Sequence, residues 1–175
     1  MSLDLSWIDP LAAAVLAFVT VQRLAELVYA RHNEALLKAR GAAEYAPGHY
    51  PAIVLLHAAW LIGLWVLGLG VTPAAGWLVL FFILQGLRLW VLATLGERWT
   101  MRIIVLPGEP LVAKGPYRLI SHPNYAVVIG EIFVLPMAFG LVWYALLFSA
   151  LNAAILFIRI RAENEALTAI AGVAR

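Results

Sequence analysis

Two separated stretches of this chain hold residue types that could do chemistry. The first is GPYRLISHPNY, residues 115–125, which gathers two prolines, two tyrosines, an arginine and a histidine in one connection. The second is RIRAENEAL, residues 159–167, which brings arginines and glutamates together in a helical pattern. Almost everything around these stretches is apolar, so their polar groups need an explanation.

In the second stretch, Arg159 and Glu163 are four residues apart, so a helix places them on one face, one turn from each other. Arg161 and Glu165 form a second pair with the same spacing on another face. The simplest interpretation is two salt bridges within the helix, with arginine also anchoring the helix end at a membrane interface. The alternative is a charge-selective pocket, in which Arg159 holds an anionic group and Glu163 a cationic one.

In the first stretch, His122 precedes Pro123, and Tyr117, Asn124 and Tyr125 are close by in sequence. Pro123 suits the first turn of a helix, where its missing N–H costs nothing, and it favours an extended conformation for His122. Tyrosines are also common anchors at the headgroup level of a membrane. The stretch therefore fits either a helix start with aromatic anchors or a binding segment with an irregular path.

The other histidines are His32, His49 and His57, and they do not have the sequence spacing of a metal site. We expect structural hydrogen bonds for His49 and His57, and we expect no metal. The chain has no cysteine, which excludes disulfides, thiolate ligands and cysteine nucleophiles.

Several polar residues lie inside apolar runs, among them Gln85, Arg88, Glu131 and Asn152. An ionised side chain near the middle of a bilayer costs at least about 2.5–3.5 kcal/mol, so such residues usually face the protein interior. Arg88 and Glu131 either pair with each other or line a ligand cavity.

The composition is that of an integral membrane protein, with 64% hydrophobic and only 13% charged residues among 175. Each crossing needs about 20 residues, so the chain suits one all-α domain, residues 1–175. The apolar runs predict a bundle of five transmembrane helices at about 10–29, 51–70, 74–95, 126–139 and 142–160. The last two are separated by a turn near Phe139–Gly140. Residues 1–9 lack the basic region and cleavage site of a signal peptide, so we expect the first apolar run to remain as a helix.

Positive charge is unevenly distributed among the predicted connections. Lysine and arginine gather in the first connection, in the third and at the C-terminus, whereas the connections near Thr72–Pro73 and Gly140 carry no charge. The positive-inside rule therefore predicts an outside N-terminus, an inside C-terminus, and a site on the cytoplasmic face of the membrane.

The third connection, about 97–124, is the longest, and it contains LPGEPLVAKGPYRLISHP with four prolines and two glycines. It cannot form one continuous helix. We expect the functional site in two segments, 106–125 and 159–167.

Together, GPYRLISHPNY and the later RIRAEN resemble the signature of the isoprenylcysteine carboxyl methyltransferase family. That signature is close to G-P-Y-x-x-x-R-H-P-x-Y followed by R-x-x-x-E-E. The resemblance extends back through LGERWTMRIIVLPGEPLVAKGPY and, more loosely, through the whole chain. The chain is most similar to the short bacterial members, some of which are associated with type III polyketide synthases and methylate alkylpyrone or alkylresorcinol hydroxyls.

The resemblance implies a membrane methyltransferase that uses S-adenosylmethionine and has no soluble Rossmann domain. It implies a catalytic pair, with Glu163 holding the cationic end of the cofactor and Arg159 facing the acceptor. The other implied cofactor contacts are Leu111, Val112, Tyr117, His122, Pro123, Asn124 and Tyr125. Ser121 stands where the family usually has arginine, and Asn164 stands where it usually has a second glutamate.

We therefore expect methyl transfer from S-adenosylmethionine to an oxygen of a lipophilic acceptor, with S-adenosylhomocysteine as the other product. Such an in-line displacement mainly needs alignment and desolvation of the two partners. The expected partners are membrane lipids and a lipophilic or prenylated acceptor, with no nucleic acid, and the sequence does not predict the oligomeric state. The alternative acceptors are an isoprenylcysteine carboxylate, an alkylpyrone or alkylresorcinol hydroxyl, and a phospholipid amine. The alternatives outside this class are a small transporter that uses Arg88 and Glu131 as pathway residues and a haem-binding membrane protein.

Overall fold

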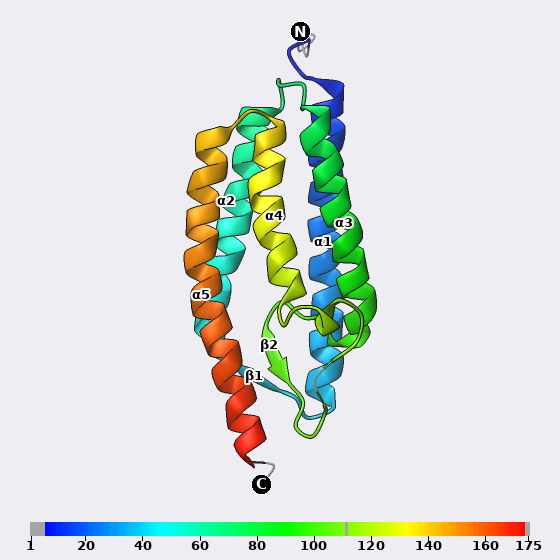
Figure 1. The fold of residues 1–175 in the computed structure, drawn as a ribbon, viewed down its shortest axis with the longest axis vertical. Helices are drawn as coiled ribbons and strands as arrows, with labels where there is room; N and C mark the ends of the chain where they lie inside the picture. The colour runs from blue at the N-terminus through cyan, green and yellow to red at the C-terminus, as the bar shows by residue number, and fades with distance from the viewer. Residues whose placement is uncertain (1–5, 111, 174–175) are drawn as a thin grey trace.

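The computed structural model describes residues 6–110 and 112–173, which fold into an elongated bundle of five α-helices (Figure 1). These are α1 (Pro10–Ala39), α2 (Tyr50–Gly68), α3 (Ala75–Leu95), α4 (Pro123–Ala138) and α5 (Val142–Val173). Within the described residues, four of them are long and apolar enough to cross a membrane, and α4 is shorter, with 16 residues. The chain is thus an all-α membrane protein, as its composition predicts.

Local sequence explains where the helices begin and end. Asp9 caps α1 by accepting a hydrogen bond from the backbone N–H of Ala12 at 2.8 Å. Pro123 occupies the first turn of α4, as predicted. The predicted reversal near Phe139–Gly140 is confirmed, because Gly140 takes a positive φ of 70° between α4 and α5.

Two helices extend beyond the predicted spans. The sequence predicts a first helix ending near 29, whereas α1 continues to Ala39, and it predicts a last helix ending near 160, whereas α5 continues to Val173. Apolar runs mark only the part of a helix that suits hydrocarbon, and these helices continue through polar residues that remain compatible with helical structure.

The third connection is irregular, as predicted, and contains the 3₁₀ turns η2 (Gly96–Arg98) and η3 (Gly115–Arg118). It also contains β2 (Ile103–Val105), which pairs antiparallel with β1 (Ala43–Tyr45) from the first connection. The first connection also includes a 3₁₀ turn, η1 (Pro47–His49). This two-stranded sheet, which the sequence does not predict, joins the α1–α2 and α3–α4 connections.

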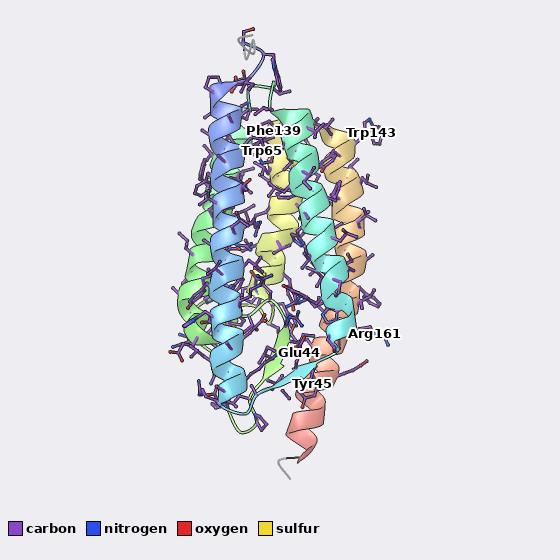
Figure 2. The ribbon with its side chains drawn as sticks, turned by 180° about the vertical axis from the view of Figure 1, so that it is seen from behind. Glu44, Tyr45, Trp65, Phe139, Trp143 and Arg161 are labelled. Carbon is purple, nitrogen blue, oxygen red and sulfur yellow. The ribbon has the colours of Figure 1, made fainter. Side chains whose placement is uncertain are left out.

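The α1–α2 and α3–α4 connections lie at the same end of the bundle as the C-terminus (Figure 1). We call this the site end. Glu44, Tyr45 and Arg161 lie at the site end, while Trp65, Phe139 and Trp143 lie toward the opposite end (Figure 2).

Helix α4 runs through the middle of the bundle and carries much of its core (Figure 1). Pro136 interrupts the helical hydrogen bonding inside α4, because it has no N–H to donate to the carbonyl of Ile132. The indole N–H of Trp60, from α2, donates to that carbonyl at 3.3 Å instead. The buried backbone acceptor is therefore satisfied by a neighbouring helix.

Candidate functional site

The centre of the candidate site is the hydroxyl of Tyr125, in the first turn of α4. It donates a short hydrogen bond to Oε2 of Glu163, and it accepts one from Nε of Arg159 at 2.8 Å. The predicted direct salt bridge between Arg159 and Glu163 is wrong, because among the described residues these two charges meet through a neutral hydroxyl instead. Their helical spacing does place both on one face of α5, and that face is turned toward α4.

His122 completes this group. Its ring stacks on the ring of Tyr125, with centroids 5.1 Å apart and planes 12° apart. Its Nδ1 lies 3.8 Å from Oε2 of Glu163. The side chains of His122 and Glu163 are 27% and 30% exposed, so both remain accessible to a ligand. His122, Tyr125, Arg159 and Glu163 are called the site cluster below.

Tyr117 comes from η3, which packs closely against the end of α3. Gly115 adopts a φ of 57°, and a Cβ at this position would lie 2.5 Å from Oγ1 of Thr94. Only glycine fits this close approach without displacing α3 or the loop. Burial, and then the negative charge of Glu163, raises the pKa of the Tyr117 phenol to about 12. The phenol therefore stays protonated at neutral pH and keeps a donor hydrogen.

A first cavity of about 590 Å³ opens beside the site cluster. Its walls come mainly from the third connection, from the start of α4 and from the part of α5 near the site end. Six of the predicted cofactor contacts line this cavity: Val112, Tyr117, His122, Asn124, Tyr125 and Glu163. Arg159 also lines it, as do Ser121 and Asn164, the two positions that differ from the family signature. Pro123 is buried at the start of α4 and is absent from this lining, and Leu111 lies outside the described residues.

A second cavity of about 280 Å³ lies deeper in the bundle, between α1, α2, α4 and α5. Its walls are mainly apolar and include Leu24, Val54, Leu61 and Ile155. The two cavities share five lining residues: Trp99, Thr100, Asn124, Tyr125 and Arg159. We call this shared wall the junction. The first cavity, with many polar lining residues, and the mainly apolar second cavity therefore meet at Tyr125.

Ion pairs hold the third connection in place above the first cavity. Glu109 contacts both Arg40 at 2.5 Å and Arg98 at 2.5 Å, and Arg98 also donates to the carbonyl of Pro110 at 2.6 Å. Glu44 in β1 contacts Lys38 at 2.8 Å and Arg102 at 2.5 Å. These contacts tie the end of α1 to the loop that covers the site.

A buried network of charges lies one layer deeper in the bundle. Arg88 contacts Glu131 at 2.7 Å, which confirms the predicted pairing, and it also contacts Glu26 at 2.5 Å. Arg23 contacts Glu131 at 2.7 Å. We call Arg23, Glu26, Arg88 and Glu131 the buried network. Its two members in α1 were not predicted, although a charged pair inside an apolar run is a signal for an internal partner.

The other predicted polar residues have different outcomes. His57 makes the expected structural contact, with Nδ1 2.9 Å from the carbonyl of Ile53. The predicted Arg161–Glu165 salt bridge is absent from the described part of the chain, and Arg161 instead lies over the ring of Phe157 at 5.6 Å. Asn152 is 1% exposed and lines the second cavity.

Comparison with known proteins gives one family and two relatives. The Isoprenylcysteine carboxyl methyltransferase (ICMT) family matches residues 77–169. The chain is 42% identical over 158 residues to a Bacillus subtilis (strain 168) protein named Uncharacterized protein YpbQ, covering 87% of this chain and 94% of that protein. It is 27% identical over 145 residues to an uncharacterized protein of Haemophilus influenzae, covering 79% of this chain and 83% of that protein. No solved structure matches this chain.

Proposed function

Because this chain belongs to the isoprenylcysteine carboxyl methyltransferase family, we propose that it is a membrane methyltransferase that moves a methyl group from S-adenosylmethionine to an oxygen of a lipophilic acceptor. One observation carries this proposal. A cavity with many polar lining residues and a mainly apolar cavity meet at Tyr125 and Arg159, as expected for an enzyme whose two ligands differ strongly in polarity.

The residues of the first cavity fit the cofactor. Its volume of about 590 Å³ lies within the range of about 300–1,000 Å³ that is usual for small-molecule sites. Glu163 offers a carboxylate that no arginine or lysine pairs with among the described residues, and this suits the cationic end of the cofactor. His122, Asn124 and the phenol of Tyr117 supply further polar contacts on the same wall.

When bound, S-adenosylmethionine supplies a methyl group on a sulfonium that is already a good leaving group. The chain's own residues therefore need only hold, align and dehydrate the partners. Tyr125 fixes both charged partners on α5, since its hydroxyl bonds to Arg159 and to Glu163. Arg159 faces the acceptor and stabilises negative charge on its oxygen. As the oxygen–methyl bond forms, the sulfur–methyl bond breaks, leaving a methyl ester or ether and the thioether S-adenosylhomocysteine.

The second cavity suits the apolar part of the acceptor. Most of its walls come from α1, α2 and α5, which are long and apolar enough to cross a membrane, and this supports entry of the acceptor from the bilayer. The cation of Arg159 favours an isoprenylcysteine carboxylate or an ionisable alkylpyrone or alkylresorcinol hydroxyl over a phospholipid amine. A carboxylate is already ionised at neutral pH, whereas a hydroxyl must first lose its proton to water or a base.

The function is tested by cofactor binding and methyl transfer in one preparation. Calorimetry in detergent should detect binding of S-adenosylmethionine, and cofactor carrying a labelled methyl group should label a lipid-extractable product. A transporter or a haem protein would give neither result. A purified, monodisperse protein that binds no S-adenosylmethionine would overturn the proposal.

We also propose that the site end faces the cytoplasm of a bacterial cell and that the N-terminus lies outside. The positive charge at the site end supports this orientation. A cysteine introduced at Thr72 should react with an impermeant maleimide added outside intact cells, whereas a cysteine at Ala113 should react only after permeabilisation. The reverse pattern would overturn the orientation.

A further inference from the structure

Trp99 is a member of the junction that has no role in the proposed mechanism. It follows η2 in the third connection, and its side chain is only 4% exposed. Its indole N–H is buried and has no hydrogen-bond partner among the residues that the structure describes. An indole nitrogen can only donate, so neither a flipped group nor a different tautomer would satisfy it.

Trp99 is held firmly in this position. Asn33 of α1 donates to the backbone carbonyl of Trp99 at 2.9 Å and to that of Gly96 at 3.2 Å. The ring packs with Ala30 and Val91, and the guanidinium of Arg88 lies 6.0 Å from its centroid. The indole ring is therefore held in place by the packing around it.

Two other tryptophans show how this bundle treats a buried indole. Trp60 donates to the carbonyl of Ile132 at 3.3 Å, and Trp65 donates to Oγ1 of Thr20 at 3.0 Å. A buried donor without a partner costs free energy, and Trp99 borders both cavities, so an acceptor atom of a bound ligand is a candidate partner for its N–H. Trp99 lines both cavities, at their junction with Arg159 and Tyr125.

We propose that the indole N–H of Trp99 binds the acceptor oxygen that receives the methyl group, and that Trp99 and Arg159 together select an oxygen as the methyl acceptor. This inference rests on the proposed function and makes it more specific. A carboxylate or hydroxyl oxygen has more than one lone pair, so it can accept the indole hydrogen and still attack with another. An amine nitrogen has a single lone pair, and accepting the same hydrogen would block its attack. Trp99 therefore acts against amine acceptors.

The test uses Trp99→Phe, which keeps an aromatic ring and removes the donor. The acceptor probes are a long-chain alkylresorcinol and an S-farnesylcysteine, each with saturating S-adenosylmethionine. For whichever probe the wild-type protein methylates, we expect kcat/KM to fall at least about tenfold in Trp99→Phe, the scale of one lost hydrogen bond to a charged group. Cofactor affinity and thermal unfolding should change little. The matched control is Trp65→Phe, which removes an indole N–H away from both cavities and should leave kcat/KM within about twofold.

A second measurement follows the N–H itself and does not require the variant to fold. In protein carrying ¹⁵N-labelled indoles, the sample is saturated with S-adenosylhomocysteine and with the unmethylated form of the probe that the wild-type protein accepts. The Trp99 N–H resonance should then shift downfield. The Trp65 resonance should not move. A Trp99 resonance that stays in place while the probe saturates, or an unchanged kcat/KM in Trp99→Phe, would overturn the role of Trp99.

Failure of this inference can be told apart from failure of the proposed function. If the wild-type protein binds no S-adenosylmethionine, both the proposed function and the role of Trp99 are wrong. A protein that binds the cofactor but methylates neither oxygen probe, or that methylates a phospholipid amine instead, overturns the oxygen acceptor and Trp99 together. A protein that methylates either oxygen probe with equal efficiency in wild type and Trp99→Phe overturns only the role of Trp99.

Discussion

The buried network and the site cluster hold similar residues and treat them differently. In the buried network, two arginines face two glutamates, and all four carboxylate oxygens of Glu26 and Glu131 accept hydrogen bonds. In the site cluster, one arginine and one glutamate are separated by the hydroxyl of Tyr125. Charges that are fully paired with each other support the fold, whereas charges held apart remain available to a ligand.

The surroundings explain this difference. Glu131 is completely buried and Glu26 and Arg88 nearly so, and an unpaired charge at such a depth would be very costly. Glu163 and His122 border a cavity and keep part of their surface exposed, so water can solvate them until a ligand arrives. Four experiments sharpen the comparison.

The largest effect is expected from Glu131→Gln, which leaves Arg23 and Arg88 with one carboxylate between them. Breaking a buried pair typically costs about 3–5 kcal/mol, and the free energy of unfolding in mixed micelles should fall by that amount. Adding Arg23→Gln restores the charge balance and should recover part of the loss. A single variant that loses less than about 1 kcal/mol would show that the buried network is not structural.

In the site cluster, Arg159→Lys should act on turnover. Lysine keeps the charge but loses the planar fork that aligns it, so we expect turnover to drop about 10²-fold, as when one preorganised donor is removed. Cofactor affinity should change little. The control is Arg161→Lys on the same helix, which should have nearly normal turnover. Equal loss of binding and turnover in Arg159→Lys would assign Arg159 to the cofactor or to the fold.

Glu163→Gln should act on cofactor binding. Losing a hydrogen bond to a charged group should weaken S-adenosylmethionine binding by about 1.5–3 kcal/mol in calorimetry. Stability should change little, because the Glu163 side chain is 30% exposed. The matched control is Glu165→Gln, because Glu165 is exposed and lies on another face of the same helix. If both variants bind the cofactor as wild type does, the assignment of Glu163 is wrong.

The smallest effect concerns Glu44, which joins β1 to Lys38 and Arg102. The hydrogen bond from Lys38, followed by that from Arg102, lowers the pKa of Glu44 below its ordinary value of 4.5. Its stabilising contribution is therefore present above pH 4.5 and is lost as the pH falls through the lowered folded pKa. Glu44→Gln should cost less than about 1 kcal/mol at neutral pH. It should also flatten the acid side of a plot of melting temperature against pH, and an unchanged slope would contradict this.

The sequence predicts most of the helical framework because apolar length is a local property. Prolines and glycines then mark the ends, as Pro123 and Gly140 do. The pairing of Ala43–Tyr45 with Ile103–Val105 has no comparable signal, since each strand has three residues and its partner lies far away in the chain.

The site divides in the same way. Arg159 and Glu163 stand out by spacing, and the family resemblance adds His122 and Tyr125. The hydroxyl bridge between the two charges is a property of how α4 packs on α5, and no spacing along the chain encodes it. Trp99 is hidden for another reason, because seven tryptophans are ordinary in a membrane protein and only packing shows which indole lacks a partner.

The short length of α4 bears on where a methylated product goes. At about 1.5 Å per residue, its 16 residues span roughly 24 Å, less than the roughly 30 Å of hydrocarbon in a bilayer. A helix of this length does not reach from one edge of the hydrocarbon to the other, so when its far end, at Ala138, lies at one edge, Tyr125 at its start lies within the hydrocarbon near the other edge. For an acceptor methylated there, the product has lost a charge or a hydroxyl and partitions more strongly into the oil phase than its precursor. Under the proposed function, the methylated product would leave into the leaflet and the spent polar cofactor toward water, so the two products would part in opposite directions.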